Sequence, residues 1–280
     1  MEKDITLRKL ESNADMRLIQ QLEREVWDMS PVPTHQTFTA SKNGGILVGA
    51  FDGEKLVGYC YGFAGFQDGK TYLCSHMMGI LPAYQSMGIG KRLKLEQRSI
   101  AKQMGYDLIT WTFDPLESRN AHLNTSKLFG ISRTYIEDCY GEMDDGLNRG
   151  LPTDRLQIEW WISSGRVELS WTPDIAKYVN PFAISRSPSG FPVLQLPEKD
   201  LPEAAEGIEV PVPQDFQAIK KQDPELALDW RMKIRSVFQS LFEAGFAVVG
   251  VRKAETGVHY YQFVSIDTIP LQPIERGDQQ

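Results

Sequence analysis

The chain has 280 residues, of which 41% are hydrophobic and 24% are charged, values typical of a globular protein with one large or two ordinary domains. Its formal net charge of −7 at pH 7 argues against nucleic acid as a partner. No apolar run reaches the roughly 18 residues that a membrane span needs, and Met1–Asp4 lacks the apolar segment of a signal peptide. Three scattered cysteines, without metal-ligand spacing, favour a cytoplasmic protein with neither a disulfide framework nor a metal site.

The N-terminal segment predicts one strand and two helices. Alternating residues over Ile5–Leu10 indicate a strand, after which Ser12 or Asn13 can cap a helix. Pro31-Val32-Pro33 ends that helix, because proline cannot continue its hydrogen bonds. A short second helix is expected over Thr34–Lys42.

Three consecutive antiparallel strands are expected next, over Ile46–Phe51, Leu56–Phe66 and Thr71–Leu81. The pairs Asp52-Gly53 and Asp68-Gly69 separate them. Asp-Gly favours a tight hairpin turn because both of its residues tolerate positive φ.

The stretch Gln85-Ser86-Met87-Gly88-Ile89-Gly90 connects the third of these strands to a predicted helix over Ile89–Met104. A turn of this kind directs several backbone N–H groups outward at the positive end of the helix. Gly88 and Gly90 lack a Cβ, so a phosphate oxygen can approach the main chain closely. Further positive charge near the same end comes from Lys91, Arg92 and Lys94. The turn therefore predicts a site for a diphosphate.

A buried strand over Asp107–Phe113 follows and should run parallel to the strand before the glycine turn, because a helix joins the two. A helix over Glu117–Phe129 and strands over Ser132–Met143 and Leu156–Ile162 come next. The polar loop between those strands, with Asp144-Asp145-Gly146, is either a functional flap or a solvated connection.

The pattern of the sequence changes after Arg166, so we expect two domains, residues 1–163 and 164–280. Val167–Trp171 can form one more strand, and the proline-rich segment Thr172–Pro213 allows only short regular elements.

A long C-terminal helix and a hairpin are expected after the proline-rich segment. Asp223 caps the helix and Pro224 occupies its first turn. The helix has an apolar stripe that should be core, and a basic set, Arg231, Lys233 and Arg235, that is interpreted as a solvated face. Phe246–Val251 and Val258–Ile266 are interpreted as the hairpin.

This order of elements, together with Gln85-x-x-Gly88-x-Gly90, resembles the GNAT superfamily of acyl-CoA-dependent N-acyltransferases. The preceding Met78-Gly-Ile80-Leu-Pro82 is similar to the strand that leads into the family's pyrophosphate motif, and Asn120 to Gly130-Ile131 is similar to its later helix. The resemblance covers about residues 4–163. It implies a mixed, mainly antiparallel sheet flanked by helices, with a C-terminal helix-plus-hairpin extension. Within the superfamily, the chain resembles a poorly characterised branch of predicted acetyltransferases that carries such an extension.

The resemblance also implies how acetyl-CoA, or another acyl-CoA, would lie. The pantetheine arm would pair with the main chain of Met78 and Ile80. Asn120 or Asn124 would hydrogen-bond the amides of this arm, or would be ordinary polar residues near the N-terminus of the helix. The diphosphate would take the amides that follow Gln85, namely those of Met87, Gly88, Ile89, Gly90 and Lys91.

Acyl transfer needs a base for the amine and an acid for the departing thiolate. His76 is the candidate base, with a hydrogen-bonded structural histidine as the equal alternative, and Cys74 on the same strand is expected only to pack. Asp114 either binds the amine, serves as base or caps the next helix. Ser126 occupies the position where many family members carry an acidic tyrosine.

The sequence hypothesis is thus an N-acyltransferase, most simply an acetyltransferase, acting on a small-molecule amine. A non-catalytic acyl-CoA-binding protein is the alternative, motivated by the missing tyrosine, and transfer to another nucleophile is a third. Neither nucleic acid nor a membrane is expected as partner, and a homodimer is left open.

Overall fold

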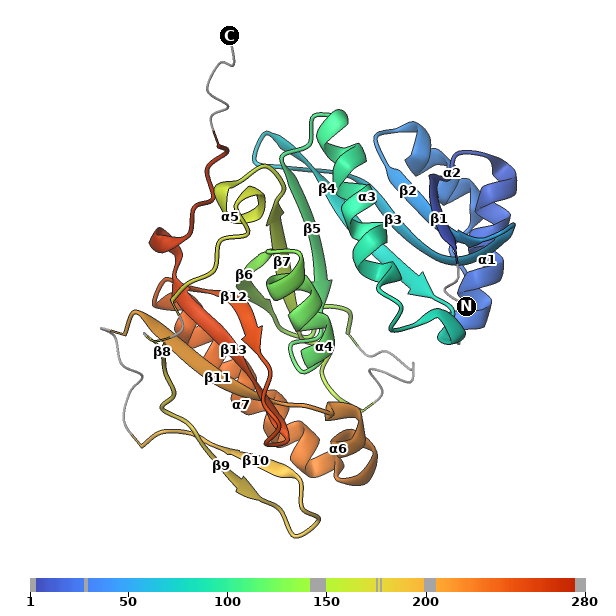
Figure 1. Ribbon diagram of the computed structural model, residues 1–280. Coiled ribbons are helices and arrows are strands. Elements are labelled where there is room, and N and C mark those ends of the chain that lie inside the picture. Colours follow the sequence, from blue (N-terminus) through green and yellow to red (C-terminus); the bar gives the residue numbers. More distant parts are fainter. Residues whose placement is uncertain are drawn as a thin grey trace. The chain divides into compact units, whose positions relative to one another are not determined.

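The computed structural model describes residues 4–27, 30–141, 150–174, 176, 178–198 and 205–274. The chain divides into two compact units, residues Met1–Trp111 and Thr112–Gln280 (Figure 1). The proposed flap at Asp144–Gly146 lies outside the described residues. No helix in the described ranges combines the length and apolarity that crossing a bilayer would need.

The first unit is built on a mixed sheet in the order β1-β2-β3-β4-β5. Neighbouring strands are antiparallel except β4 and β5, which pair in parallel at Leu73–Ile109 and Cys74–Thr110. The strands are β1 (Ile5–Lys9), β2 (Ile46–Asp52), β3 (Lys55–Gln67), β4 (Lys70–Ile80) and β5 (Leu108–Phe113). The Asp68-Gly69 turn and the parallel pair agree with the prediction from sequence, and the predicted fold class is confirmed. At the first hairpin the two-residue loop is Gly53-Glu54 instead of Asp52-Gly53, because Asp52 still pairs with Lys55 and Gly53 takes the positive φ.

Helices cover both faces of this sheet. They are α1 (Asn13–Val26), α2 (Thr34–Lys42) and α3 (Ile89–Gln103), with a 3-10 turn, η1, at Pro82–Tyr84. Adjacent residues of β3 point to opposite faces: the Tyr59 hydroxyl donates to Glu23 of α1, and the Cys60 thiol donates to the Leu93 carbonyl of α3. Hence α1 and α3 lie on opposite sides of the sheet.

Local signals explain where α1 and α3 begin. Ser12 caps α1 in a capping box with Asp15, which satisfies two N–H groups at the helix start. Gly88, in the left-handed conformation, precedes α3.

The second unit has a sheet in the order β7-β6-β12-β13-β11-β8, antiparallel except for the pair β11 and β8. A separate antiparallel pair joins β9 to β10. The strands are β6 (Ile131–Ile136), β7 (Arg155–Trp161), β8 (Tyr178–Val179), β9 (Ala183–Arg186), β10 (Pro192–Gln195), β11 (Gly207–Pro213), β12 (Phe246–Arg252) and β13 (Val258–Ser265).

The long helix α7 (Pro224–Glu243) buries one face in the core of this unit. Its Phe238 ring packs edge-on against Tyr261 and Phe263 of β13, with centroids 5.0 and 4.9 Å apart. Asp223 caps α7 and Pro224 begins it, as the sequence predicts. The other helical segments are α4 (Ser118–Ala121), a π-helix η2 (His122–Lys127), α5 (Gly165–Glu168), α6 (Phe216–Gln222) and a 3-10 turn η4 (Ile266–Thr268).

Three further local expectations are wrong. Residues Val167–Trp171 are not a strand, because the chain turns through α5 and buries Arg166, whose guanidinium binds carbonyls that include those of Phe129 and Trp171. Strand β6 ends at Ile136 rather than Met143, since Asp138 adopts positive φ (42°) in the turn that follows. The basic face of α7 is not solvated throughout, as Arg231 is only 2% exposed.

Candidate active site

The glycine turn has the geometry of an anion site. Gly88 is the N-cap of α3 with φ of +75°, no side chain caps the helix there, and nothing lies within 4 Å of where its Cβ would be. The first-turn amides of α3 therefore lack an acceptor from the cap residue, and the space in front of Gly88 is open. Gly90 is packed inward, where a Cβ would lie 3.4 Å from Ile80 Cδ1 and 3.5 Å from Met78 Cε.

Three basic residues near this turn have different surroundings. Lys91 and Arg92 are exposed, and Arg92 Nη2 donates to the Ile5 carbonyl at 2.6 Å. Lys94, which the sequence suggests as one more cation beside the turn, is instead buried at 3% exposure. Only Lys91 and Arg92 can therefore offer a solvent-facing charge to a bound anion.

Lys94 occupies a buried polar site between α3 and the sheet. Its Nζ donates to Ser75 Oγ at 2.7 Å and lies 3.8 Å from the centre of the Trp111 ring. No carboxylate forms an ion pair with it in the described part of the chain, and the thiols of Cys60 and Cys74 are the acidic groups that favour its charge. Burial lowers the pKa of Lys94 to about 8, because the interior disfavours its charge.

The main chain of β4 has the arrangement that the family resemblance requires. Its ladder with β5 ends at Cys74–Thr110, whereas β4 continues to Ile80. Met78 and Ile80 pair on the other side with Cys60 and Gly58 of β3. The β4 segment from Ser75 to Ile80 is thus not hydrogen-bonded to β5.

His76 lies on this segment of β4, beside two aromatic rings of β3. Its ring centroid is 6.1 Å from Tyr61 and 5.7 Å from Phe63. Desolvation beside these rings lowers the pKa of His76 below its ordinary value of 6.5, so the imidazole is mainly neutral at pH 7. Burial also raises the pKa of the Cys74 thiol, which keeps it protonated.

The same aromatic pair lines a pocket of about 480 Å³ on the α2 side of the sheet. Besides Tyr61 and Phe63, its walls come from one face of α2, namely His35, Gln36, Thr39 and Ala40. His76, which contacts both rings, therefore lies next to a cavity of small-molecule size.

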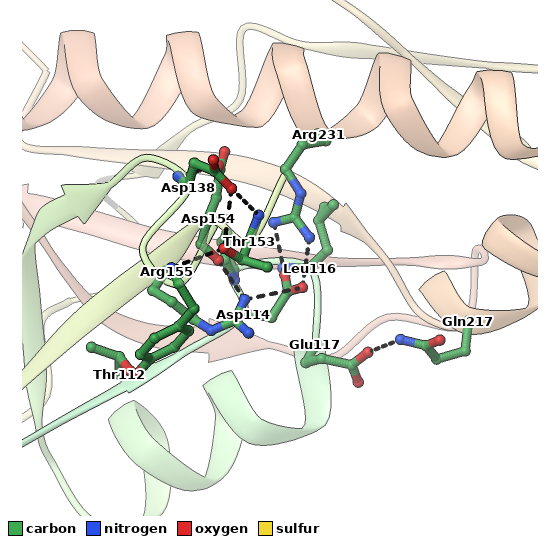
Figure 2. Close-up of polar contacts among 12 residues, drawn as sticks. Thr112, Asp114, Leu116, Glu117, Asp138, Thr153, Asp154, Arg155, Gln217 and Arg231 are labelled. Carbon is green, nitrogen blue, oxygen red and sulfur yellow. Dashed lines mark hydrogen bonds and ion pairs between the residues drawn. The ribbon is translucent and has the colours of Figure 1, made fainter. Parts of the chain in front are cut away.

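The remaining candidate residues belong to the second unit. Both carboxylate oxygens of Asp114 accept from Arg231 Nη1 and Nη2, at 2.9 and 2.6 Å (Figure 2). Asp114 also accepts from the Leu116 amide at 2.8 Å. The carboxylate is therefore fully engaged within its own unit.

The polar residues of α4 and η2 differ in accessibility. Asn120 is exposed, while Asn124 is buried and its backbone carbonyl accepts from the Gly130 amide at 2.9 Å. Ser126 Oγ accepts from the Val251 amide at 2.9 Å and donates to the Val251 carbonyl at 3.4 Å. Ser126 thus joins η2 to β12.

Two tyrosines of the second unit, Tyr135 and Tyr140, also have hydrogen-bond partners there. Tyr135 donates to Asp154 at 2.7 Å, and the Tyr140 hydroxyl lies 2.7 Å from Thr112 Oγ1. Tyr140 is half exposed, whereas burial raises the pKa of Tyr135 well above 10.

Residues 13–124 match the family model described as the acetyltransferase (GNAT) family. The predicted GNAT domain is confirmed over that segment. It includes the glycine turn, β4 with His76, and α4 up to Asn124. A comparison with curated protein sequences gave no significant match.

Solved structures with a similar arrangement include three acetyltransferases, each covering 56% of this chain. The ribosomal-protein-S18-alanine N-acetyltransferase of Escherichia coli is 14% identical, with 94% of its own chain covered and a TM-score of 0.44. A GNAT acetyltransferase of Streptococcus pneumoniae is 15% identical (98% covered, TM-score 0.45). Arabidopsis thaliana NAA60, solved with acetyl-CoA, is 12% identical (99% covered, TM-score 0.45).

Proposed function

We propose that this chain is an acyl-CoA-dependent N-acyltransferase, most simply an acetyltransferase that uses acetyl-CoA and acts on a small-molecule amine. The observation that carries the proposal is the start of α3, where Gly88 leaves the first-turn amides uncapped and open within the segment that matches the GNAT model. The three described cysteines are all free, which supports a reducing, cytoplasmic setting.

The residues present fit the cosubstrate. The amides of Met87 to Lys91 would hold its diphosphate, and Gln85 lies at the entry to the turn, where its Nε2 donates to the Ile80 carbonyl at 3.4 Å. The main chain of Met78 and Ile80 would pair with the pantetheine arm. Asn120 and Asn124 belong to the second unit, and their contact with the cosubstrate stays a prediction from the sequence. When bound, acyl-CoA supplies the acyl group as a thioester.

His76 is the proposed base. A protonated amine must lose a proton before it can attack, and the lowered pKa of His76 makes the imidazole free to accept that proton at pH 7. The pocket lined by Tyr61 and Phe63 gives the amine's carbon skeleton an apolar surface next to this imidazole.

Lys94 is the proposed electrostatic element. Its ammonium is held in the interior next to Ser75, on the α3 side of β4, whereas the adjacent residue His76 faces the aromatic rings on the α2 side. A fixed positive charge in a low-dielectric site stabilises negative charge that develops nearby, such as that on a departing thiolate. We assign Asp114 and Ser126 structural roles instead, since their contacts to Arg231 and Val251 occupy the groups that catalysis would use.

Calorimetric titration with acetyl-CoA tests the shared premise. Gly88→Glu places a carboxylate at the proposed phosphate position and should abolish detectable binding, whereas the wild type binds. Gly69→Glu is the matched control, because Gly69 has nearly the same φ (+76°) and equally open space, but lies in the β3–β4 turn. The proposal fails if the wild type does not bind, or if both variants bind like the wild type.

Release of free thiol over a panel of amines then distinguishes an enzyme from a binding protein. Binding of acetyl-CoA without thiol release in the presence of any amine would favour the non-catalytic alternative.

A further inference from the structure

A cavity of about 910 Å³ lies within the second unit, away from the residues that line the pocket beside His76. Its walls are the chain entering α4 at Leu116–Arg119, the start of α6 at Gln214–Gln217, and the β12–β13 turn at Lys253–Glu255, with His259 beside them. We call this cavity the C-terminal pocket. Its volume is that of a small-molecule site.

One wall of the C-terminal pocket offers a carboxylate that lacks a cation. Glu117 is partly buried, and Gln217 Nε2 donates to its Oε1 at 2.5 Å (Figure 2). Burial raises the pKa of Glu117, and the nearby negative charges of Asp114 and Asp215 raise it further. No cation pairs with Glu117 in the described ranges, so an ammonium group on a ligand would stabilise its ionised form.

The β12–β13 side of the pocket offers donors for an acidic group. His259 is 7% exposed, and its Nδ1 accepts from the Ala254 amide at 3.3 Å, which assigns the ring proton to Nε2. Burial and the charge of Lys253 lower the pKa of His259, so it acts as a neutral donor. Lys253 is exposed at the rim of the pocket and has no ion pair among the residues described.

We infer that the C-terminal pocket binds a small zwitterion that carries both an amine and a carboxylate, such as a free α-amino acid. The amine pairs with Glu117, and the carboxylate with Lys253 and the Nε2–H of His259. Three carboxylates, Glu117, Asp215 and Glu255, line the pocket together with two cations, Lys253 and Arg119. A ligand that carries both charges therefore matches the pocket better than a simple anion or a simple cation. This inference does not depend on acyl transfer.

Thermal shift measurements with the twenty common amino acids, followed by calorimetry of the best ligand, test the inference without acyl-CoA. Concentrations reach about 10 mM, because weak sites have millimolar dissociation constants. At least one amino acid should bind, while its N-acetyl derivative and its amide, each lacking one charge, should bind at least about tenfold more weakly. Single-charge analogues that bind equally well, or no binding at all, would overturn it.

Substitutions of pocket residues test whether the ligand binds in this pocket. Lys253→Met and Glu117→Gln should each weaken binding by about tenfold or more, and Lys253 is exposed, so its replacement leaves the fold intact. Lys221→Met, at an exposed position of the same unit outside the pocket, should not change it. Binding unchanged in Lys253→Met would refute the assignment. So would an equal loss of acetyl-CoA affinity in that variant, since the pocket would then belong to the cosubstrate.

Discussion

Arg231 and Asp114 form a bidentate ion pair inside the second unit, although 117 positions separate them in the sequence. The Arg231 side chain is 2% exposed and that of Asp114 is 12% exposed, so solvent screens the pair little (Figure 2). The contact joins the middle of α7 to the residue that follows β5. It ties the C-terminal helix to a segment that lies within the matched GNAT region.

Removing one partner of this pair should be costly. Asp114→Ala leaves the Arg231 charge buried without its counter-charge, and we expect a loss of about 3–5 kcal/mol in the free energy of unfolding. The double variant Asp114→Ala with Arg231→Met should recover part of that loss, because the Arg231 charge is then absent, while Arg155, whose Nη1 lies 3.9 Å from Asp114 Oδ2, still loses this partner. Urea unfolding measures both, and a loss below about 1 kcal/mol in Asp114→Ala would show that the pair is not structurally important.

Lys94 should reduce stability at neutral pH. Its pKa is about 8 in the folded protein and about 10.4 in an unfolded chain, so the unfolded state binds more protons between these values and stability rises with pH there. Below pH 8 the full penalty applies, up to about 3 kcal/mol. Lys94→Met should therefore be more stable than the wild type at pH 7, with a gap that narrows as pH rises above 8.

The control for Lys94 is Lys91→Met, on the exposed first turn of the same helix, whose stability should follow the wild type at every pH. Turnover should fall in Lys94→Met if its charge assists the reaction. A variant that is both more stable and fully active would leave this lysine without the catalytic role proposed above.

His76 should set the acidic limb of the pH profile. Because its pKa is lowered, kcat/KM should rise with pH through a midpoint below 6.5 and then level off. His76→Gln should lose about 10²–10⁴-fold in kcat and lose this limb. His35→Gln, at a second histidine that lines the same pocket, should keep the acidic limb, because His35 is not the proposed base. If the limb persists in His76→Gln, another group is the base.

Gly88 and Gly90 should respond differently to alanine. A Cβ on Gly90 meets Ile80 and Met78 at ordinary contact distances and does not require positive φ, so Gly90→Ala should keep its stability or gain up to about 1 kcal/mol. Gly88→Ala must adopt φ of +75° and should lose about 1 kcal/mol. Thermal unfolding measures the stability of both variants, and a severe loss of stability in Gly90→Ala would contradict the packing described for that residue.

Local signals were sufficient for most of the secondary structure. The Ser12 cap, the Asp68-Gly69 turn and the start of α7 at Pro224 depend on residues within a few positions of each other. The glycine turn was found for the same reason, because its strand, turn and helix are contiguous. The predicted roles of individual site residues stay predictions.

The sequence could not show which charged side chains turn inward. Arg231 and Arg235 resemble a solvated helix face until their partners, Asp114 and Asp154, are brought close by the fold. Lys94 follows two exposed basic residues, and only the position of Ser75 on the sheet explains its burial. Likewise, the walls of the C-terminal pocket come from three separate stretches of chain, so no motif marks them.

Strand β11 also affects how this protein behaves in concentrated solution. It pairs with β13 along its whole length, but on its other side β8 covers only Gly207 and Ile208 in the described part of the chain. Pro211 and Pro213, two residues apart, point their nitrogen atoms to the same side, and proline has no N–H to donate. Another molecule therefore cannot extend the sheet along this stretch, which protects the protein against edge-to-edge aggregation.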